Sequence, residues 1–339
     1  MRVMAAVCLA VLAACSGAPP ATRQPAGPSP WVEYPGGRGP GAGRHVVLVS
    51  GDEEYRSEEA LPMLGRLLAE RHGFRCTVLF AIDKVDGCIN PDEPTNIPGL
   101  SALDDADLLV LFTRFRHLPD ADMAHLVAYV ESGLPVIGLR TATHAFAYSA
   151  DSSSLFARWS WDSPEWPGGF GRQVLGETWV AHHGNHGHES TRGVIPEAAR
   201  GLPLLRGVAD VWGPTDVYAI SSLPPDSVTL LEGAVVAGMT PDSTPVADGR
   251  NDPRMPVAWC RERPLPDGGT QRVVCSTLGA AVDLTCEDLR RLLVNAAYWC
   301  TGLEVPEHAE AEPVGEYEPT MFGFGGFRKG VRPEELAAE

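Results

Sequence analysis

The fold is decided by one stretch near the N-terminus, HVVLVSGDEEYRSEEA, which spans residues 45–60. Its first six residues are rich in β-branched valine, which predicts a buried strand over residues 45–50. The polar segment GDEEYR then ends the strand. Ser57 and the two glutamates after it are typical of a first helical turn, because acidic side chains favour the positive end of the helix dipole. We therefore expect a helix over residues 57–72 with a leucine-rich face.

The same alternation of strand and helix continues along the chain. Short apolar runs predict further strands over residues 74–81, 106–112, 135–139, 255–259 and 271–276. Amphipathic patterns predict helices over residues 119–132 and 287–299. Such alternation predicts an α/β fold, with a mainly parallel, doubly wound sheet and helices on both faces. Residues 151–215, rich in Gly, Trp and His, are expected to form loop-rich insertions.

Polar residues follow three of the predicted strands. They are Asp52, Glu53, Glu54, Tyr55 and Arg56, then Arg114, Arg116 and His117, and then Arg140, Thr141, Thr143 and His144. Ligands of doubly wound sheets bind at the carboxyl ends of the strands, so these residues predict a polar cleft. The four arginines suit a carboxylate or a hydroxyl-rich ligand. Alternatively, at least two of them pair with Asp52, Glu53 or Glu54, because a buried unpaired guanidinium is costly.

Four histidines lie in the glycine-interrupted segment AHHGNHGHE, residues 181–189: His182, His183, His186 and His188. Imidazole is a common metal ligand, and a loop can bring two or three rings onto one divalent ion such as Zn²⁺. The spacing matches no standard zinc motif, so polar lining of a substrate cleft and an exposed loop stay as alternatives. His144 is a candidate general base or ligand, or else a buried structural imidazole.

Seven segments, in order, carry a resemblance to a known family: VLVSGDEEYRSEEALP, FTRFRHLPD, PVIGLRTATHAF, GETWVAHHGNHGHESTRG, RGVADVWGPTDVY, MPVAW and RLLVNAAYW. They resemble the ThuA-like (trehalose-utilisation) family of the class I glutamine amidotransferase-like superfamily. The closing FGFGGFRKGVRP is similar to an exported subgroup of planctomycete-type bacteria. The resemblance covers about residues 31–335. It implies a flavodoxin-like, three-layer α/β domain and a carbohydrate or sugar derivative as substrate.

The resemblance also defines what the site lacks. Glutaminases of the superfamily carry a Cys nucleophile in a G-x-C-x-G turn, where this chain has Gly138-Leu139-Arg140-Thr141-Ala142. A guanidinium stays protonated and cannot act as a nucleophile, so we expect no amide transfer. Many ThuA-like sequences have Gly-His near the C-terminal strand, whereas this chain has Gly279-Ala280.

Further residues complete the predicted site. Asp216 matches an acidic position of the family and would orient a histidine or a substrate hydroxyl. With His144 and His183 it forms the predicted catalytic set, and Trp179 joins the polar strand ends in the substrate-binding set. Three tryptophans, at positions 159, 161 and 166, lie in a loop rich in Pro and Gly. They are suited to stack on a sugar, or alternatively to pack as a lid on their own domain.

The N-terminus predicts export. Residues 1–15 combine one positive charge, a short apolar run and the lipobox-like LAAC, so we expect a signal peptide and lipidation of Cys15. An ordinary signal peptide is the alternative, and Ser16 favours the outer membrane. Residues 16–30 form a linker rich in Pro, Ala and Gly. We expect the ThuA-like domain over residues 31–302 and a C-terminal extension, residues 303–339, packed partly on it.

Charge and cysteine content restrict the partners. The 27 Lys and Arg against 44 Asp and Glu give a net charge of −17, which disfavours nucleic acid and leaves the lipid anchor as the contact with the membrane. An oxidising compartment permits disulfides, with Cys260–Cys275 and Cys76–Cys88 as candidate pairs. Cys286 and Cys300 lie about 21 Å apart along one predicted helix, too far to bond.

Three functions fit these observations. The first is an exported enzyme that acts on a sugar through acid–base or metal-assisted chemistry. The second is a non-catalytic, lipid-tethered carbohydrate-binding protein. The third, based on the histidine loop alone, is a surface protein that buffers metal.

Overall fold

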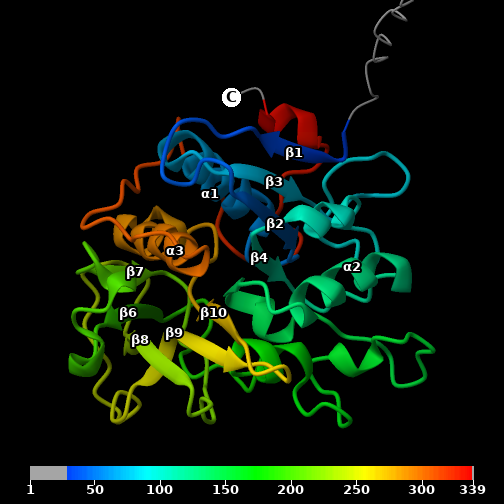
Figure 1. Cartoon of the computed structure of the whole chain (residues 1–339). Helices are drawn as coiled ribbons and strands as arrows, with labels where there is room; N and C mark the ends of the chain where they lie inside the picture. Colours follow the sequence, from blue (N-terminus) through cyan, green and yellow to red (C-terminus); the bar gives the residue numbers. More distant parts are fainter. Residues whose placement is uncertain (1–28, 338–339) are drawn as a thin grey trace, which may run out of the picture.

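One mixed sheet forms the centre of the molecule (Figure 1). The computed structural model describes residues 29–337, so the predicted signal peptide, Cys15 and most of the linker lie outside the described residues. Ten strands within these residues pair in the order β1-β3-β2-β4-β5-β10-β9-β8-β6-β7. They are β1 Trp31–Tyr34, β2 His45–Gly51, β3 Arg75–Leu79, β4 Leu108–Thr113, β5 Val136–Leu139, β6 Ser190–Val194, β7 Val211–Gly213, β8 Ser227–Val236, β9 Met255–Pro264 and β10 Thr270–Ser276.

The five strands β3, β2, β4, β5 and β10 run parallel to one another. Strands buried on both faces read as continuous apolar runs, and β2 shows why. Val46 and Leu48 belong to the core on one face of the sheet, while Val47 and Val49 belong to the core on the other. The strands predicted in this half are confirmed, with ends that differ by one or two residues.

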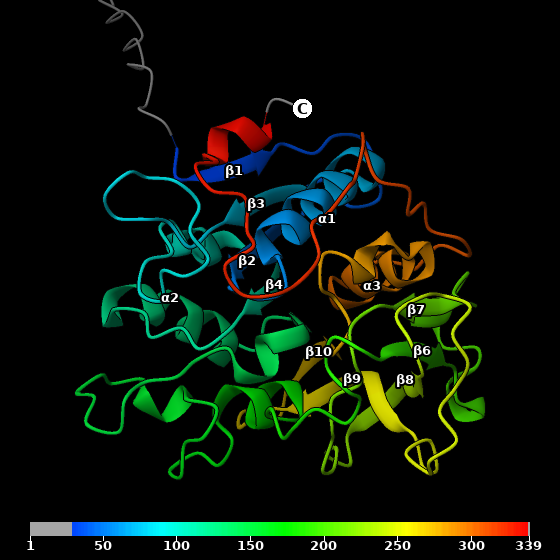
Figure 2. The same cartoon turned by 180° about the vertical axis from the view of Figure 1, so that it is seen from behind.

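Three longer helices cover the parallel half: α1 Ser57–His72, α2 Asp120–Glu131 and α3 Glu287–Cys300. The apolar faces of α1 and α3 pack on the side of Val46 and Leu48, and α2 packs on the opposite side. Both views show the helices on the two faces of the sheet (Figure 2). All three helices are confirmed, and so is the α/β class. No helix within residues 29–337 combines the length and apolar composition needed to cross a bilayer.

Short helical turns occupy many of the connections. They are η1 Leu100–Asp105, η2 Arg140–His144, η3 Ala157–Trp159, η4 Gly171–Leu175, η5 Glu197–Ala199, η6 Pro203–Leu205, η7 Asp283–Thr285 and η8 Pro333–Ala337. Of these, η2 begins directly after β5 and positions the strand-end residues Arg140 to His144. The segment before η8 returns across α1, and the Tyr34 hydroxyl donates to the Leu336 carbonyl at 3.1 Å.

The other half of the sheet is antiparallel and was largely missed by the sequence analysis. β9 pairs with both β10 and β8, β8 with β6, β6 with β7, and β1 closes the far edge against β3, all antiparallel. The sheet is therefore mixed and not mainly parallel. β6 and β7 have five and three residues and lie in the region expected to be loops. Strands this short show no usable periodicity.

The two candidate disulfides are not formed, since all six cysteines of the described chain are free. For Cys260 and Cys275 the register gives the reason. Cys260 lies opposite Val274, and Cys275 lies opposite Trp259, so the two thiols are on opposite faces of the sheet. Side chains one register position apart cannot meet across a strand pair.

Candidate active site

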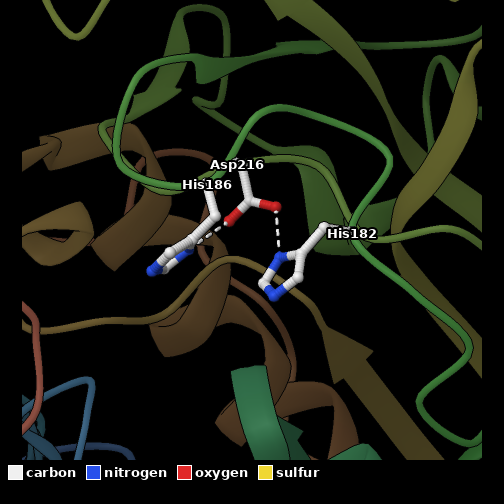
Figure 3. A group of neighbouring side chains, drawn as sticks. All are labelled: His182, His186 and Asp216. Atoms are coloured by element: carbon white, nitrogen blue, oxygen red, sulfur yellow. Dashed lines mark hydrogen bonds and ion pairs between the residues drawn. The ribbon is translucent and has the colours of Figure 1, made fainter.

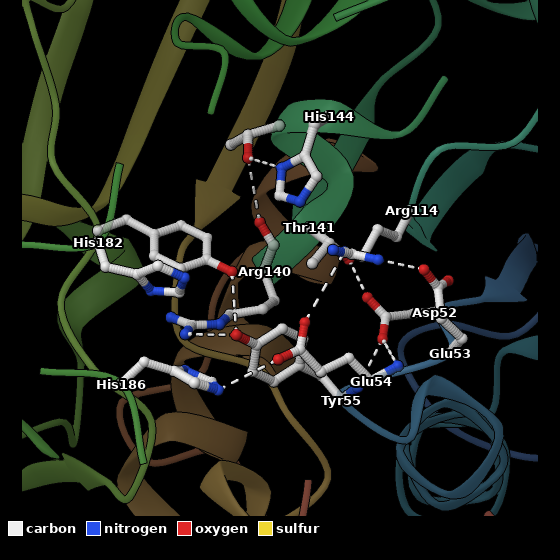
Figure 4. A network of polar contacts seen from close by, with 12 residues as sticks. Asp52, Glu53, Glu54, Tyr55, Arg114, Arg140, Thr141, His144, His182 and His186 are labelled. Atoms are coloured by element: carbon white, nitrogen blue, oxygen red, sulfur yellow. Dashed lines mark hydrogen bonds and ion pairs between the residues drawn. The ribbon is translucent and has the colours of Figure 1, made fainter. Parts of the chain in front are cut away.

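The chain order of the sheet brings the predicted strand ends together. From β2 the chain crosses to β3 on one side and then returns to β4 on the other. Gly51 at the end of β2 pairs with Thr113 at the end of β4, and β5 lies next to β4. The segments that follow β2, β4 and β5 therefore meet at one edge (Figure 4). This is the switch point at which open α/β sheets bind ligands.

Asp52 connects the segment after β2 to the segment after β5 through hydrogen bonds. Its side chain is fully buried, and Oδ1 accepts the backbone N–H groups of Glu54 at 2.7 Å and Tyr55 at 2.5 Å. Its second oxygen accepts the hydroxyl of Thr141. Burial, together with the charge of Glu53, raises the pKa of Asp52 to about 6 despite these hydrogen bonds. Asp52 and Thr141, both in the predicted substrate-binding set, connect the loops to each other.

Arg140 follows β5 directly, and its side chain is fully buried. Its backbone φ of 43° lies in the left-handed region, which residues other than glycine rarely adopt. The guanidinium donates to the carbonyls of Asp216 at 2.8 Å and Thr277 at 2.7 Å, and to Asp216 Oδ1 at 2.8 Å. It also lies over the rings of Tyr55 and Tyr218, 4.5 and 3.8 Å from their centroids. Arg140 is thus a buried counter-ion.

Asp216, the partner of this arginine, also contacts two histidines, which Figure 3 shows beside it. Its Oδ2 accepts from His182 Nδ1 at 2.7 Å, and its Oδ1 lies 3.1 Å from His186 Nδ1. Burial opposes the charge of Asp216, but Arg140 and the two histidine hydrogen bonds outweigh it and hold the pKa of this carboxyl well below its ordinary value. Asp216 therefore stays ionised and fixes the orientation of both rings.

His186 lies between two carboxylates. Nδ1 faces Asp216, and Nε2 lies 3.2 Å from Glu54 Oε1. The hydrogen bonds to Asp216 and then to Glu54 raise the pKa of His186 to about 9, although partial burial opposes this. At neutral pH His186 is thus an imidazolium with both ring N–H groups engaged. It clamps Glu54 to Asp216.

A pocket of about 240 Å³ opens beside this cluster. It is lined by Glu54, Tyr55, Arg114, Phe115, His144, Trp179, His182 and Tyr218. His144 is buried, and burial together with the charges of Arg114 and Arg140 holds its pKa well below the ordinary value, so its ring is neutral. Its ring centroid lies 4.9 Å from that of Phe115 and 5.8 Å from that of Trp179. The pocket therefore has aromatic walls and a few polar groups.

Several predicted residues act inside the protein and not in the pocket. Glu53 pairs with Arg114 and with Arg116, which is buried and donates to the carbonyls of Pro91 and Glu93 at 2.9 Å. Arg56 donates to the Gly323 carbonyl at 2.7 Å. At least two of the predicted arginines, Arg114 and Arg116, therefore pair with a carboxylate of the protein itself. Thr143 is buried too, with its hydroxyl 3.1 Å from His144 Nδ1.

Two of the four loop histidines do not reach the site. His183 Nε2 lies 2.9 Å from the carbonyl of Arg250, on the far side of the loop, and His188 is exposed. The backbone explains the division between neighbours, because His182 forms an isolated β-bridge with Tyr218, and successive side chains of extended backbone point to opposite sides. Of the four predicted histidines, His182 and His186 thus contact Asp216, whereas His183 and His188 lie outside this group.

Some pocket residues were missed by the sequence analysis. Phe115 follows Arg114 at the end of β4, and Tyr218 lies two residues after Asp216. A signal existed for both, because each belongs to a segment already singled out. Phe322 borders the site without lining the pocket: its ring lies 5.5 Å from that of Tyr55 and 5.3 Å from that of His186. It begins the closing segment FGFGGFRKGVRP, but nothing in that segment indicated that it would reach this site. Of the three loop tryptophans, Trp161 packs against Phe115 and Trp179, whereas Trp159 is buried against Trp166.

His182, His186 and Asp216 are also the residues that could hold a metal ion. Within residues 29–337 they form the group whose ligand atoms all lie within 4.8 Å of one another. Two features oppose a divalent ion in this arrangement. Arg140 already neutralises Asp216, and both nitrogens of His186 face carboxylates. Binding through Nδ1 would require His186 to lose the proton of that nitrogen, while Nε2 could keep its contact with Glu54.

Fold and site together define an α/β protein with a buried Arg–Asp pair that orients a half-exposed histidine. No family model matches the chain, and no curated protein matches it. Two solved structures described as ThuA-like are similar to it. One, from Bacteroides uniformis ATCC 8492, has a TM-score of 0.47 at 13% identity and covers 79% of this chain and 95% of its own. The other, from Parabacteroides merdae ATCC 43184, has a TM-score of 0.49 at 14% identity and covers 83% and 97%.

Removing the charge of Arg140 is expected to destabilise the protein strongly. Arg140→Met leaves Asp216 buried beside one counter-charge fewer, and we expect a loss of about 3–5 kcal/mol in the free energy of unfolding. Arg158→Met is the matched control, because Arg158 pairs with Glu131 in solvent and should cost at most about 1 kcal/mol. Urea denaturation measures both. Equal losses in the two variants would contradict a central role for Arg140.

The environment of His186 predicts an unusual titration. In an NMR experiment its imidazole should titrate with a pKa of about 9, and Glu54→Gln should lower this value because one of the two carboxylates is removed. Because the folded pKa lies above that of the unfolded chain, the stability from His186 is complete below about pH 6.5 and is lost as pH rises through 9. A His186 pKa below 7 in the unsubstituted protein would contradict the clamp.

Proposed function

We propose that this protein is an exported, lipid-anchored ThuA-like protein that acts on a carbohydrate or sugar derivative, with His182 as general acid–base. One observation carries the chemistry: His182 Nδ1 lies 2.7 Å from the ionised Asp216, while the ring lines the pocket. A buried carboxylate of this kind fixes the tautomer of the histidine and stabilises the imidazolium that forms when Nε2 takes a proton. Nε2 is the nitrogen left for the substrate.

The pocket walls suit one sugar ring. Trp179 and Phe115 offer aromatic faces to the C–H surface of a sugar, and Glu54 and Arg114 offer groups that bind hydroxyls. The volume of about 240 Å³ is below the roughly 300–1,000 Å³ of pockets for drug-sized ligands. The choice of a sugar derives from the ThuA-like sequence segments, and the size and lining of the pocket agree with it.

In this proposal the reaction is not amide transfer. Arg140 takes the place of the nucleophile and is engaged with Asp216 and two carbonyls. None of the six cysteines within the described residues lines the pocket. Proton transfer by His182 is the chemistry for which the pocket has a positioned group. Glu54, held by His186, is placed in the wall to accept a substrate hydroxyl.

Two alternatives rest on the same residues. A divalent ion such as Zn²⁺, bound by His182, His186 and Asp216, would favour metal-assisted chemistry or metal buffering. A pocket that binds a sugar without turnover would make this a carbohydrate-binding protein. The flavodoxin-like arrangement, the amidotransferase-like superfamily and the exported subgroup are part of the proposal, supported by the order of the quoted segments.

Replacing His182 should abolish turnover while sparing the fold. On a panel of mono- and disaccharides and their keto derivatives, His182→Gln is expected to lower kcat/KM by about 10²–10⁴. His183→Gln is the matched control and should keep full activity, because His183 faces Arg250. Unchanged turnover in His182→Gln would refute the mechanism. Binding of a sugar in calorimetry without any product would favour the carbohydrate-binding alternative. One zinc ion bound per chain, and lost in His186→Gln, would favour the metal-binding alternative.

The anchor is tested separately. Cys15→Ser removes the thiol that would carry the lipid, so the exported chain should move from the membrane fraction to the soluble fraction. Mass spectrometry of the mature N-terminus checks the modification directly. A chain cleaved elsewhere and found soluble without the substitution would show an ordinary signal peptide.

A further inference from the structure

The closing motif FGFGGF, residues 322–327, has no part in the proposed function so far. The chain in this region (red in Figure 2) turns back over the segment that follows β2. The N–H of Gly323 donates to the Glu54 carbonyl at 2.7 Å, and the carbonyl of Gly323 accepts from Arg56 Nη2 at 2.7 Å. Both backbone polar groups of Gly323 are therefore bonded to the segment that supplies Glu54 to the pocket wall.

Glycines on both sides of Phe324 give this segment its shape. Gly323 and Gly325 have φ of 137° and 68°, values that residues with a side chain rarely adopt. A Cβ atom on Gly326 would lie 2.3 Å from Arg56 Nη2, the same nitrogen that donates to Gly323. The glycines therefore allow a tight turn that is hydrogen-bonded to the rest of the protein, and Phe324 lies within this turn.

The ring of Phe324 continues the aromatic wall of the pocket. Phe324 is 65% exposed, and the guanidinium carbon of Arg114 lies 5.1 Å from its ring centroid. The same carbon lies 4.6 Å from the ring centroid of Phe115, and both Arg114 and Phe115 line the pocket. A single exposed apolar side chain is ordinary on a protein surface. This one adjoins the pocket through Arg114, so pocket wall and exposed ring form one continuous surface.

The size of the pocket determines what would reach this surface. A volume of about 240 Å³ suits one sugar ring, so a second ring joined to the first must lie outside the pocket. Phe324 offers an aromatic face there for the C–H surface of that second ring. The guanidinium of Arg114 carries five N–H groups, and its side chain is 19% exposed, so it can donate to a hydroxyl while it stays paired with Glu53.

We propose that Phe324 and Arg114 form a second sugar subsite at the rim of the pocket, which makes the protein prefer a disaccharide or a longer glycan to a monosaccharide. This inference rests on the proposed function in one respect, that the pocket binds a sugar. It does not depend on His182 as general acid–base. Phe324 determines specificity by packing against the second ring and takes part in no chemical step.

The test compares monosaccharides with disaccharides that contain them. Calorimetric titrations use D-glucose with maltose, cellobiose and trehalose, and D-galactose with lactose and melibiose. At least one disaccharide should bind about tenfold more tightly than its monosaccharide, and Phe324→Ala should reduce this ratio of affinities to about one. Phe324→Trp should keep the ratio, because an indole also offers an aromatic face. Phe327→Ala is the matched control: it removes the same ring from the same segment, where that ring faces Lys329, and should keep the ratio.

The outcomes separate this inference from the proposed function. Because Phe324 is mostly exposed, the Tm of Phe324→Ala should stay close to that of the unsubstituted protein, which confirms that the variant folds. Equal affinities for mono- and disaccharides, an undiminished ratio in Phe324→Ala, or an equal loss in Phe327→Ala would overturn the subsite and leave the sugar pocket intact. Binding of no sugar at all would overturn both proposals. Turnover that survives in His182→Gln would refute only the acid–base role.

Discussion

The buried ion pair between Arg140 and Asp216 is the interaction on which the site depends. Arg140 follows β5 in the parallel half of the sheet, whereas Asp216 lies between β7 and β8 in the antiparallel half. Each side chain is fully buried, so neither charge could remain without the other. Their pairing, with the added bond from Arg140 to the Thr277 carbonyl, ties the two halves together at the carboxyl edge of the parallel strands.

This constraint also sets the order of the polar groups around the pocket. With Asp216 ionised by Arg140, His182 is held through Nδ1 and His186 is charged and reaches Glu54. The chain therefore places a permanent cation directly after β5, and the two histidines that contact Asp216 come from a different segment of the chain. The backbone strain at Arg140, with φ of 43°, is retained because the surrounding contacts fix the side chain.

The predictability of the structure follows the length of the patterns only in part, because the ten-residue strand β8 was not predicted. β2 and α1 were predicted within a residue, because six strand residues and a sixteen-residue helix repeat their pattern often enough to be recognised. β6 and β7 were missed, because five and three residues are too few. In the site, Asp216, His182, His144 and Trp179 were singled out beforehand. Sequence could not tell which of the adjacent His182 and His183 turns toward Asp216.

The sequence by itself determined the alternation of strand and helix, the charged strand ends, the absence of a cysteine at residue 140 and the chemical types in the histidine loop. All of these are local properties, set by residue type and spacing. Only the tertiary structure decided which arginines are internal counter-ions, that Phe322 packs against Tyr55, and that Phe324 lies beside Arg114. These depend on contacts between residues up to 267 positions apart, which no local pattern encodes.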